Sequence, residues 1–112
     1  MGVLVVEDSE AIGKMLVQVL ERAGFEAKWT DNVEDALSTA AEWIPDVVLL
    51  DLHLGDAPGI EVAKKLRKSA ATSKVRVIGL SGDPPAKAEQ KHLDGFLLKP
   101  VALAAVVEAV RG

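Results

Sequence analysis

The sequence contains no cysteine, which excludes disulfide bonds and thiolate metal sites and is typical of a reducing compartment. No apolar run approaches the roughly 20 residues that a helix needs to cross a bilayer. The first residues lead almost directly into an apolar stretch, residues 3–6, without the basic segment that opens a signal peptide. We therefore expect a cytoplasmic protein that does not associate with membranes.

The sequence also has no dense cluster of Lys and Arg, and its formal net charge is −4. This mild acidic balance argues against a surface that binds nucleic acid. Apolar residues make up 49% of the chain, which is enough for a core and too much for a disordered protein. Because the 112 residues contain no repeat, low-complexity tract or linker, we expect a single domain over residues 1–112.

Short apolar or alternating runs predict five β-strands, at residues 3–6, 25–30, 47–50, 75–80 and 96–98. Apolar residues at helical spacing predict helices between them, at residues 12–23, 36–44, 59–67 and 101–111. Strands that alternate with helices form parallel βαβ units with right-handed crossovers. The pattern predicts an α/β fold: a flavodoxin-like, doubly wound (βα)5 three-layer sandwich with a five-stranded parallel sheet. Residues 86–92 are nearly all polar or Ala, so the fourth helix is expected to be short or irregular.

Residues with ionisable or nucleophilic side chains follow four of the five predicted strands. They are Glu7 and Asp8 after the first strand, Asp51 after the third, Ser81 after the fourth and Lys99 after the fifth. All strands of a parallel sheet end at the same edge, where α/β proteins bind their ligands. We therefore expect these five residues to meet at one site.

Three carboxylates at one site repel each other, which raises pKa values and destabilises the fold unless a cation is bound. Mg²⁺ prefers hard oxygen ligands and keeps several waters. Asp8 and Asp51 suit direct coordination, and Glu7 suits coordination through water. A carboxylate can also attack phosphorus to form an acyl phosphate. Phosphoryl transfer needs the charge on the phosphoryl oxygens to be neutralised, and Mg²⁺, the Lys99 ammonium and the Ser81 hydroxyl are three groups suited to these oxygens.

Four motifs in this order resemble the receiver domain of two-component response regulators, the CheY-like family. They are LVVED at the first strand, LLDLHL followed by PG at the third, LSG at the fourth and FLLKP at the fifth. Each motif is weak alone, but their conjunction is specific and covers essentially the whole chain. The resemblance implies a phosphorylation-dependent signalling switch of two-component phosphorelays. Such a domain phosphorylates and dephosphorylates itself and is not a turnover enzyme.

The resemblance also implies a role for each matching residue. Asp51 resembles the phosphoacceptor, and Glu7 and Asp8 resemble the acidic pair that holds Mg²⁺ together with Asp51. The roles carried over from the rest of the motifs are these: the backbone carbonyl of His53 as a further metal ligand, Ser81 as the hydroxyl that moves to the phosphoryl group, Lys99 as its ion-pair partner, Pro100 as the residue after a cis bond, and Phe96 as the aromatic switch.

The implied phosphodonor is a phosphohistidine on a histidine kinase or a histidine phosphotransfer protein. We expect this partner to dock over the first helix, near Ala11, Lys14 and Met15, and we expect the protein to be a monomer. The side chain of His53 is interpreted as exposed. Trp29 and Trp43 are interpreted as packing residues.

The sequence departs from the usual receiver pattern in three features. The loop after Asp51 carries Gly55, Asp56 and Pro58, with Gly55 where Pro is common. Ser81 and Lys99 are only 18 positions apart, which again predicts a short fourth helix, and Asp83 adds a negative charge to this segment.

Other functions remain open at this point. A phosphorylation-independent interaction module on a receiver scaffold fits the short fourth helix, although the intact acidic site opposes it. A metal-dependent phosphatase would need a DxD arrangement on the first strand, which is missing. A flavin binder would need a phosphate-cradling loop rich in Gly or Ser/Thr after that strand, which is also missing.

Overall fold

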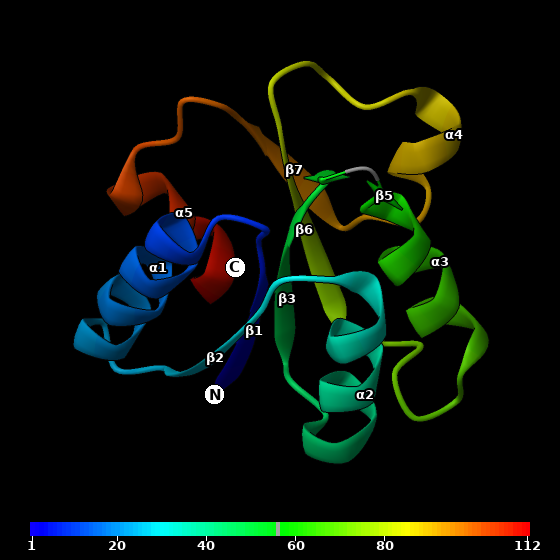
Figure 1. Ribbon diagram of the computed structural model, residues 1–112, viewed down its shortest axis with the longest axis horizontal. Coiled ribbons are helices and arrows are strands. Elements are labelled where there is room, and N and C mark those ends of the chain that lie inside the picture. Colours follow the sequence, from blue (N-terminus) through cyan, green and yellow to red (C-terminus); the bar gives the residue numbers. More distant parts are fainter. Residues whose placement is uncertain (56) are drawn as a thin grey trace.

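The computed structural model describes residues 1–55 and 57–112. Strands and helices alternate along the chain as the sequence predicts, and the fold is a flavodoxin-like α/β sandwich (Figure 1). The elements are β1 (Gly2–Val6), α1 (Glu10–Arg22), β2 (Glu26–Thr30), α2 (Val33–Trp43), β3 (Val47–Asp51), β4 (His53–Leu54), β5 (Ala57–Pro58), α3 (Ile60–Lys68), β6 (Arg76–Ser81), α4 (Lys87–Gln90), β7 (Gly95–Leu98) and α5 (Leu103–Arg111).

The main sheet has the strand order β2-β1-β3-β6-β7, and all of its pairings are parallel. The central strand, β3, is buried at all five positions, as expected for an unbroken apolar run covered on both faces. Its register with β1 pairs Val6 with Leu50, and its register with β6 pairs Asp51 with Leu80. The residues after Val6, Leu50 and Leu80 therefore meet at one edge.

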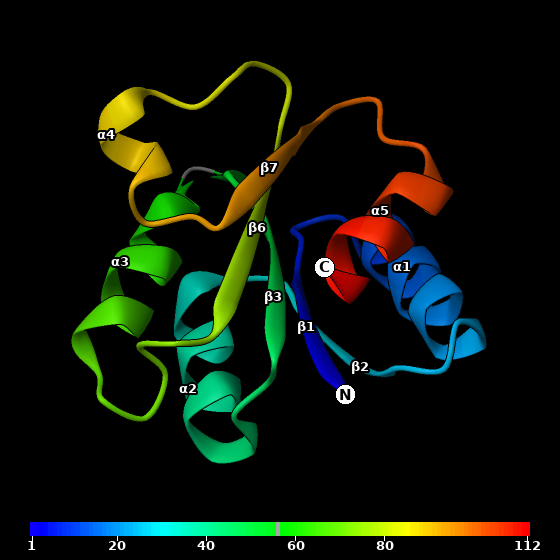
Figure 2. The ribbon, with the colours of Figure 1, turned by 180° about the vertical axis from the view of Figure 1, so that it is seen from behind.

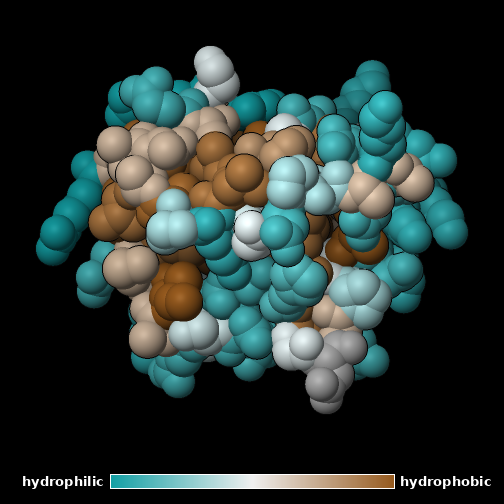
Figure 3. Space-filling view, turned by 90° about the horizontal axis from the view of Figure 1, so that it is seen from above, coloured by the Kyte–Doolittle hydropathy of each residue, from teal (hydrophilic) through white to brown (hydrophobic). Residues whose placement is uncertain are grey.

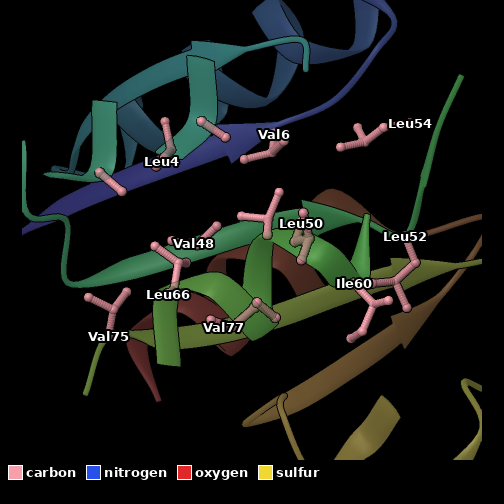
Figure 4. Packing of buried hydrophobic residues seen from close by; sticks show 14 residues of the cluster. Leu4, Val6, Val48, Leu50, Leu52, Leu54, Ile60, Leu66, Val75 and Val77 are labelled. Carbon is pink, nitrogen blue, oxygen red and sulfur yellow. The ribbon is translucent and has the colours of Figure 1, made fainter. Parts of the chain in front are cut away.

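Helices cover both faces of this sheet, with α1 and α5 on one side and α2 and α3 on the other (Figures 1 and 2). Side chains of a strand alternate between faces, so each strand contributes to two separate cores. Val5, Leu49 and Leu80 pack towards α1 and α5, where Leu16, Leu20 and Val106 are buried. Their neighbours Leu4, Val48 and Leu50 pack towards α2 and α3, together with Ile60 and Leu66 (Figure 4).

The structure corrects some of the predicted boundaries. The last helix begins at Leu103 rather than at Val101, because residues 99–102 form the connection that leads out of β7. A two-stranded antiparallel hairpin, β4–β5, follows β3 and was not predicted from the turn-forming residues there. Gly55 lies in its turn with φ +57°, a conformation that favours glycine, whereas Asp56 lies outside the described residues.

The fourth helix, α4, has only four residues, as predicted. The segment that follows it is held by Arg67 of α3. The Arg67 guanidinium donates to the carbonyl oxygens of Ser73, Val75 and His92 and pairs with Asp94 Oδ2 at 2.7 Å. The same carboxylate accepts a 2.7 Å hydrogen bond from the Val77 N–H. This network ties the chain before β7 to α3 and β6.

Within the part of the chain that the structure describes, no helix combines the length and the hydropathy needed to span a membrane.

Candidate functional site

Three carboxylates meet at the carboxyl edge of the sheet. Glu7 and Asp8 follow β1, and Asp51 ends β3; each offers an oxygen within 4.8 Å of those of the other two. Asp51 and Glu7 are each only 2% exposed, whereas Asp8 is exposed. Both buried carboxylates lie at the ends of adjacent parallel strands, so their proximity follows from the register of β1 with β3.

Two groups bind the Asp51 carboxylate directly. Lys99 Nζ lies 3.2 Å from Asp51 Oδ1, and the backbone N–H of His53 donates to the same oxygen at 3.0 Å. The His53 side chain is exposed, as interpreted from the sequence. The peptide bond between Lys99 and Pro100 is cis, as the resemblance implies. The Asp51 carboxylate is therefore held by the ammonium group of Lys99, which follows β7, and by the backbone of the loop that follows β3.

Glu7 is a buried carboxyl whose pKa is raised. Burial raises the pKa of its carboxyl to about 7; the Ser9 N–H opposes this shift, Asp51 and Asp8 add to it, and Lys99 opposes it. Glu7 Oε1 accepts the Ser9 N–H at 3.2 Å, but Oε2 is buried and has no hydrogen-bond partner among residues 1–55 and 57–112. A buried carboxylate oxygen without a partner is costly, and a bound cation would satisfy it.

The cluster fits a divalent cation in charge as well as in chemistry. When ionised, the three carboxylates and the Lys99 ammonium carry a net charge of −2, which Mg²⁺ would neutralise. All of the side-chain donors are hard carboxylate oxygens, which Mg²⁺ prefers. Receiver-type Mg²⁺ binding therefore fits the residues Glu7, Asp8 and Asp51.

The loop after β3 is packed tightly against the cluster. Gly55 N donates to Asp8 Oδ2 at 3.1 Å, and Gly59 N donates to the Leu52 carbonyl at 2.9 Å. A Cβ atom on Gly59 would overlap the backbone oxygen of Asp51. This contact leaves no room for a side chain at the start of α3.

Ser81 and Phe96 do not join this cluster among the residues that the structure describes. Their neighbours Leu80 and Leu97 pack towards α1 and α5, so alternation directs Ser81 and Phe96 to the opposite face. Ser81 is buried, and its Oγ accepts the Asp83 N–H at 3.4 Å; among the described residues it makes no hydrogen bond to Asp51. Phe96 is half-buried in β7. Lys99 thus pairs with Asp51, whereas Ser81 bonds the Asp83 N–H. The switch roles of Ser81 and Phe96 stay predictions.

A groove of about 460 Å³ opens beside the cluster, between α1 and α5. Glu7 and Lys99 line its inner end, and apolar side chains line the rest, among them Ile12, Met15 and Leu103, which are 40–43% exposed. Figure 3 looks down on this edge, and hydrophobic side chains gather on the α1 and α5 side, at the left of the view. Ile12 therefore lies in this groove and not in the core.

One contact of the site was missed by sequence reasoning. Trp29, interpreted as a packing residue, donates its indole N–H to the backbone carbonyl of Glu7 at 2.8 Å. The alternating pattern of residues 25–30 puts Trp29 near the end of the second strand, and that strand pairs with β1. The signal was therefore present, but only the register shows that Trp29 reaches Glu7.

A doubly wound parallel sheet with an acidic pocket at its carboxyl edge defines the class: a flavodoxin-like α/β domain. The chain belongs to the family described as "Response regulator receiver domain", which matches residues 3–111. Members of this family are signalling switches of two-component systems rather than turnover enzymes; they interact with histidine kinases or phosphotransfer proteins and generally bind Mg²⁺ in an acidic pocket.

Individual relatives agree with this assignment. The chain is 29% identical to the polar-differentiation response regulator DivK of Brucella anthropi, over 98% of this chain and 93% of that protein. Its structure resembles that of the chemotaxis protein CheY4 of Vibrio cholerae, with a TM-score of 0.91, 25% identity, and coverage of 98% and 95% of the two chains. A CheY-like receiver domain from Methylobacillus flagellatus gives a TM-score of 0.90 at 27% identity, with coverage of 99% and 96%.

Proposed function

We propose that residues 1–112 act as one receiver unit in which Asp51 accepts a phosphoryl group from a phosphohistidine. One Asp51 carboxylate oxygen attacks phosphorus, the P–N bond breaks, and the imidazole nitrogen keeps the bonding electron pair. The product is an acyl phosphate on Asp51. Bound Mg²⁺, held by Glu7, Asp8, Asp51 and the His53 carbonyl, would neutralise charge on the phosphoryl oxygens.

The observation that carries this assignment is the clustering of three carboxylates with Lys99 at 3.2 Å from Asp51. A buried acidic neighbour repels an ionised carboxylate. A carboxylate that only ended a strand would therefore gain nothing from such a neighbour. Lys99 holds Asp51 before the reaction and can pair with the phosphoryl oxygens afterwards. Ser81 would have to turn from the Asp83 N–H towards the phosphoryl group, and Phe96 would follow it inward.

The experiment that tests this function is intact mass after incubation with acetyl phosphate, with and without Mg²⁺. We expect one phosphoryl adduct that requires Mg²⁺ and is lost in Asp51→Asn. Asp46→Asn is a matched control, because Asp46 precedes the same strand at its other end. If the folded wild-type protein forms no adduct, the phosphoacceptor role is wrong and the phosphorylation-independent interaction module becomes the better proposal.

We further propose that the phosphodonor docks an apolar helix face into the groove between α1 and α5. The groove is continuous with the site, since Glu7 and Lys99 line it, so a histidine on the docked helix could approach Asp51. Ile12→Ala should slow transfer from a phosphorylated histidine phosphotransfer protein but not from acetyl phosphate. Ile44→Ala is the control, because Ile44 is equally exposed, at 43%, and lies outside the groove. Equal effects of both variants would exclude this docking face.

A further inference from the structure

Trp29 of the edge strand β2 lies directly behind the acidic pair. Its indole Nε1 donates to the Glu7 carbonyl at 2.8 Å, and the next residue, Thr30, accepts the Glu7 N–H at 3.0 Å. Both backbone polar groups of Glu7 are therefore held by the last two residues of β2. This is the point at which the chain leaves β1 and turns into α1.

The first helix is shaped around the same indole. A Cβ atom on Gly13 would overlap the five-membered ring of Trp29, including Nε1. Gly13 is buried in α1, one turn after the helix cap Ser9, whose carbonyl accepts the Gly13 N–H at 2.8 Å. Glycine weakens a helix interior relative to alanine, so its presence here is explained by the space that the indole needs. The indole thus lies between β2, Glu7 and the start of α1.

This arrangement affects the direction in which the carboxylates project. Rotation of the peptide after Glu7 would move both Glu7 and Asp8, because they flank it. The Trp29 hydrogen bond fixes the carbonyl of that peptide, and the rigid ring blocks movement of α1 towards it. Groups that bind and orient metal ligands from behind typically change metal affinity by 10–100-fold when they are mutated.

We propose that Trp29 is a positioning residue for the Mg²⁺ site: through the Glu7 backbone it keeps the carboxylates of Glu7 and Asp8 preassembled next to Asp51. The inference rests on the proposed function, because it assumes that these carboxylates bind Mg²⁺. Trp29 bonds the backbone of Glu7 and not its carboxylate, so it acts through Glu7.

The test compares Trp29→Phe with Trp43→Phe in the full chain. Trp43 packs against Lys28 and against Gly2, which starts β1 at the end opposite to Glu7, so it is a matched control. Mg²⁺ affinity is measured by calorimetry, and unfolding by urea is measured in EDTA. We expect Trp29→Phe to weaken Mg²⁺ binding about tenfold, at the low end of the range for outer partners of metal ligands. Trp43→Phe should bind as the wild type does, even where it destabilises the fold.

A spectroscopic readout separates positioning from a general loss of structure. In Trp43→Phe, Trp29 is the only indole, and its emission should change with Mg²⁺ at the midpoint that calorimetry gives. In Trp29→Phe the remaining indole, Trp43, should not respond. Gly13→Ala provides a second perturbation, because it displaces the ring without removing its N–H; it should also weaken Mg²⁺ binding.

The outcomes are distinct. Wild-type Mg²⁺ affinity in folded Trp29→Phe, or an equal loss in Trp43→Phe, would overturn the positioning role. If Trp29→Phe does not fold, Gly13→Ala decides, and wild-type affinity in that variant overturns the role. If the wild-type protein itself does not bind Mg²⁺, the metal site of the proposed function is wrong and the inference is overturned with it, a result visible without any variant.

Discussion

Replacement of Glu7 by Gln should stabilise the protein at neutral pH while abolishing its response to Mg²⁺. Burial, with Asp51 and Asp8 nearby, raises the pKa of Glu7 from 4.5 to about 7, against the opposing effects of the Ser9 N–H and Lys99. The side chains that line the groove from α1, Ile12, Met15 and Leu16, carry no charge. In the absence of a cation, the ionised Glu7 is therefore tolerated only at a cost.

The size of this cost follows from linkage. Each unit of pKa shift corresponds to about 1.4 kcal/mol, so the shift from 4.5 to about 7 corresponds to about 3 kcal/mol. Because the folded-state pKa lies above the unfolded-state value, the folded form binds the proton more tightly. The contribution of the Glu7 carboxyl to the free energy of unfolding is fully present below about pH 4.5 and is lost as the pH rises through about 7.

The Gln variant is neutral at every pH and keeps an oxygen to accept the Ser9 N–H. At pH 8 without Mg²⁺ we expect it to be more stable than the wild type by up to about 3 kcal/mol, and at pH 5 by less than about 1 kcal/mol. Excess Mg²⁺ should stabilise the wild type and leave the variant unchanged. The measurement is urea unfolding of both proteins from pH 5 to pH 8, in EDTA and in Mg²⁺.

The matched control is Glu10→Gln, at the first residue of α1 and three positions along the chain from Glu7. Glu10 is exposed and its pKa is lowered by its hydrogen bond and charge interaction with Lys14. The contribution of Glu10 to stability therefore depends on pH in the opposite direction to that of Glu7: it is present at neutral pH and is lost as the pH falls. A difference between wild type and Glu7→Gln that does not change between pH 5 and pH 8 would refute the argument from burial.

Three further predictions concern the surroundings of the site. Gly59→Ala should destabilise the fold by about 1–3 kcal/mol and slow phosphorylation, because the added methyl group overlaps the Asp51 carbonyl; urea unfolding and intact mass measure both effects. Arg67→Met should cost about 2–3 kcal/mol, since it leaves backbone carbonyls and Asp94 without their partner; an unchanged unfolding midpoint would contradict this. Asp83→Ala should prolong the acyl phosphate severalfold if Asp83 orients a hydrolytic water; equal decay rates would exclude that role.

Local patterns were sufficient for most of the fold. The apolar run 47–50 is too short for a helix and is bounded by turn formers, so it predicted a strand buried on both faces, and β3 is that strand. Asn32 is a residue type that favours helix caps, and its side chain accepts the Asp35 N–H at the start of α2. These features depend on neighbours within a few residues, which is why the sequence alone reveals them.

The convergence of the charged residues on one edge of the sheet was also predictable, because parallel strands with right-handed crossovers must end at one edge. No contact between the side chains was needed to infer that Glu7, Asp51 and Lys99 would meet there. The side to which each points is harder to infer. Ser81 ends β6, a strand of the same sheet, yet its Oγ accepts the Asp83 N–H and, among the described residues, makes no hydrogen bond to Asp51.

The sequence by itself thus determined the order of the elements, the central strand and the set of residues at its edge. Only the tertiary structure decided the contacts between residues distant in the chain: the indole of Trp29 on Glu7, the N–H of Gly55 on Asp8, and the apolar groove between α1 and α5. The physical reason is that periodicity specifies which face of an element is buried. Strand register and helix packing then specify which atoms meet, and both depend on the whole folded chain.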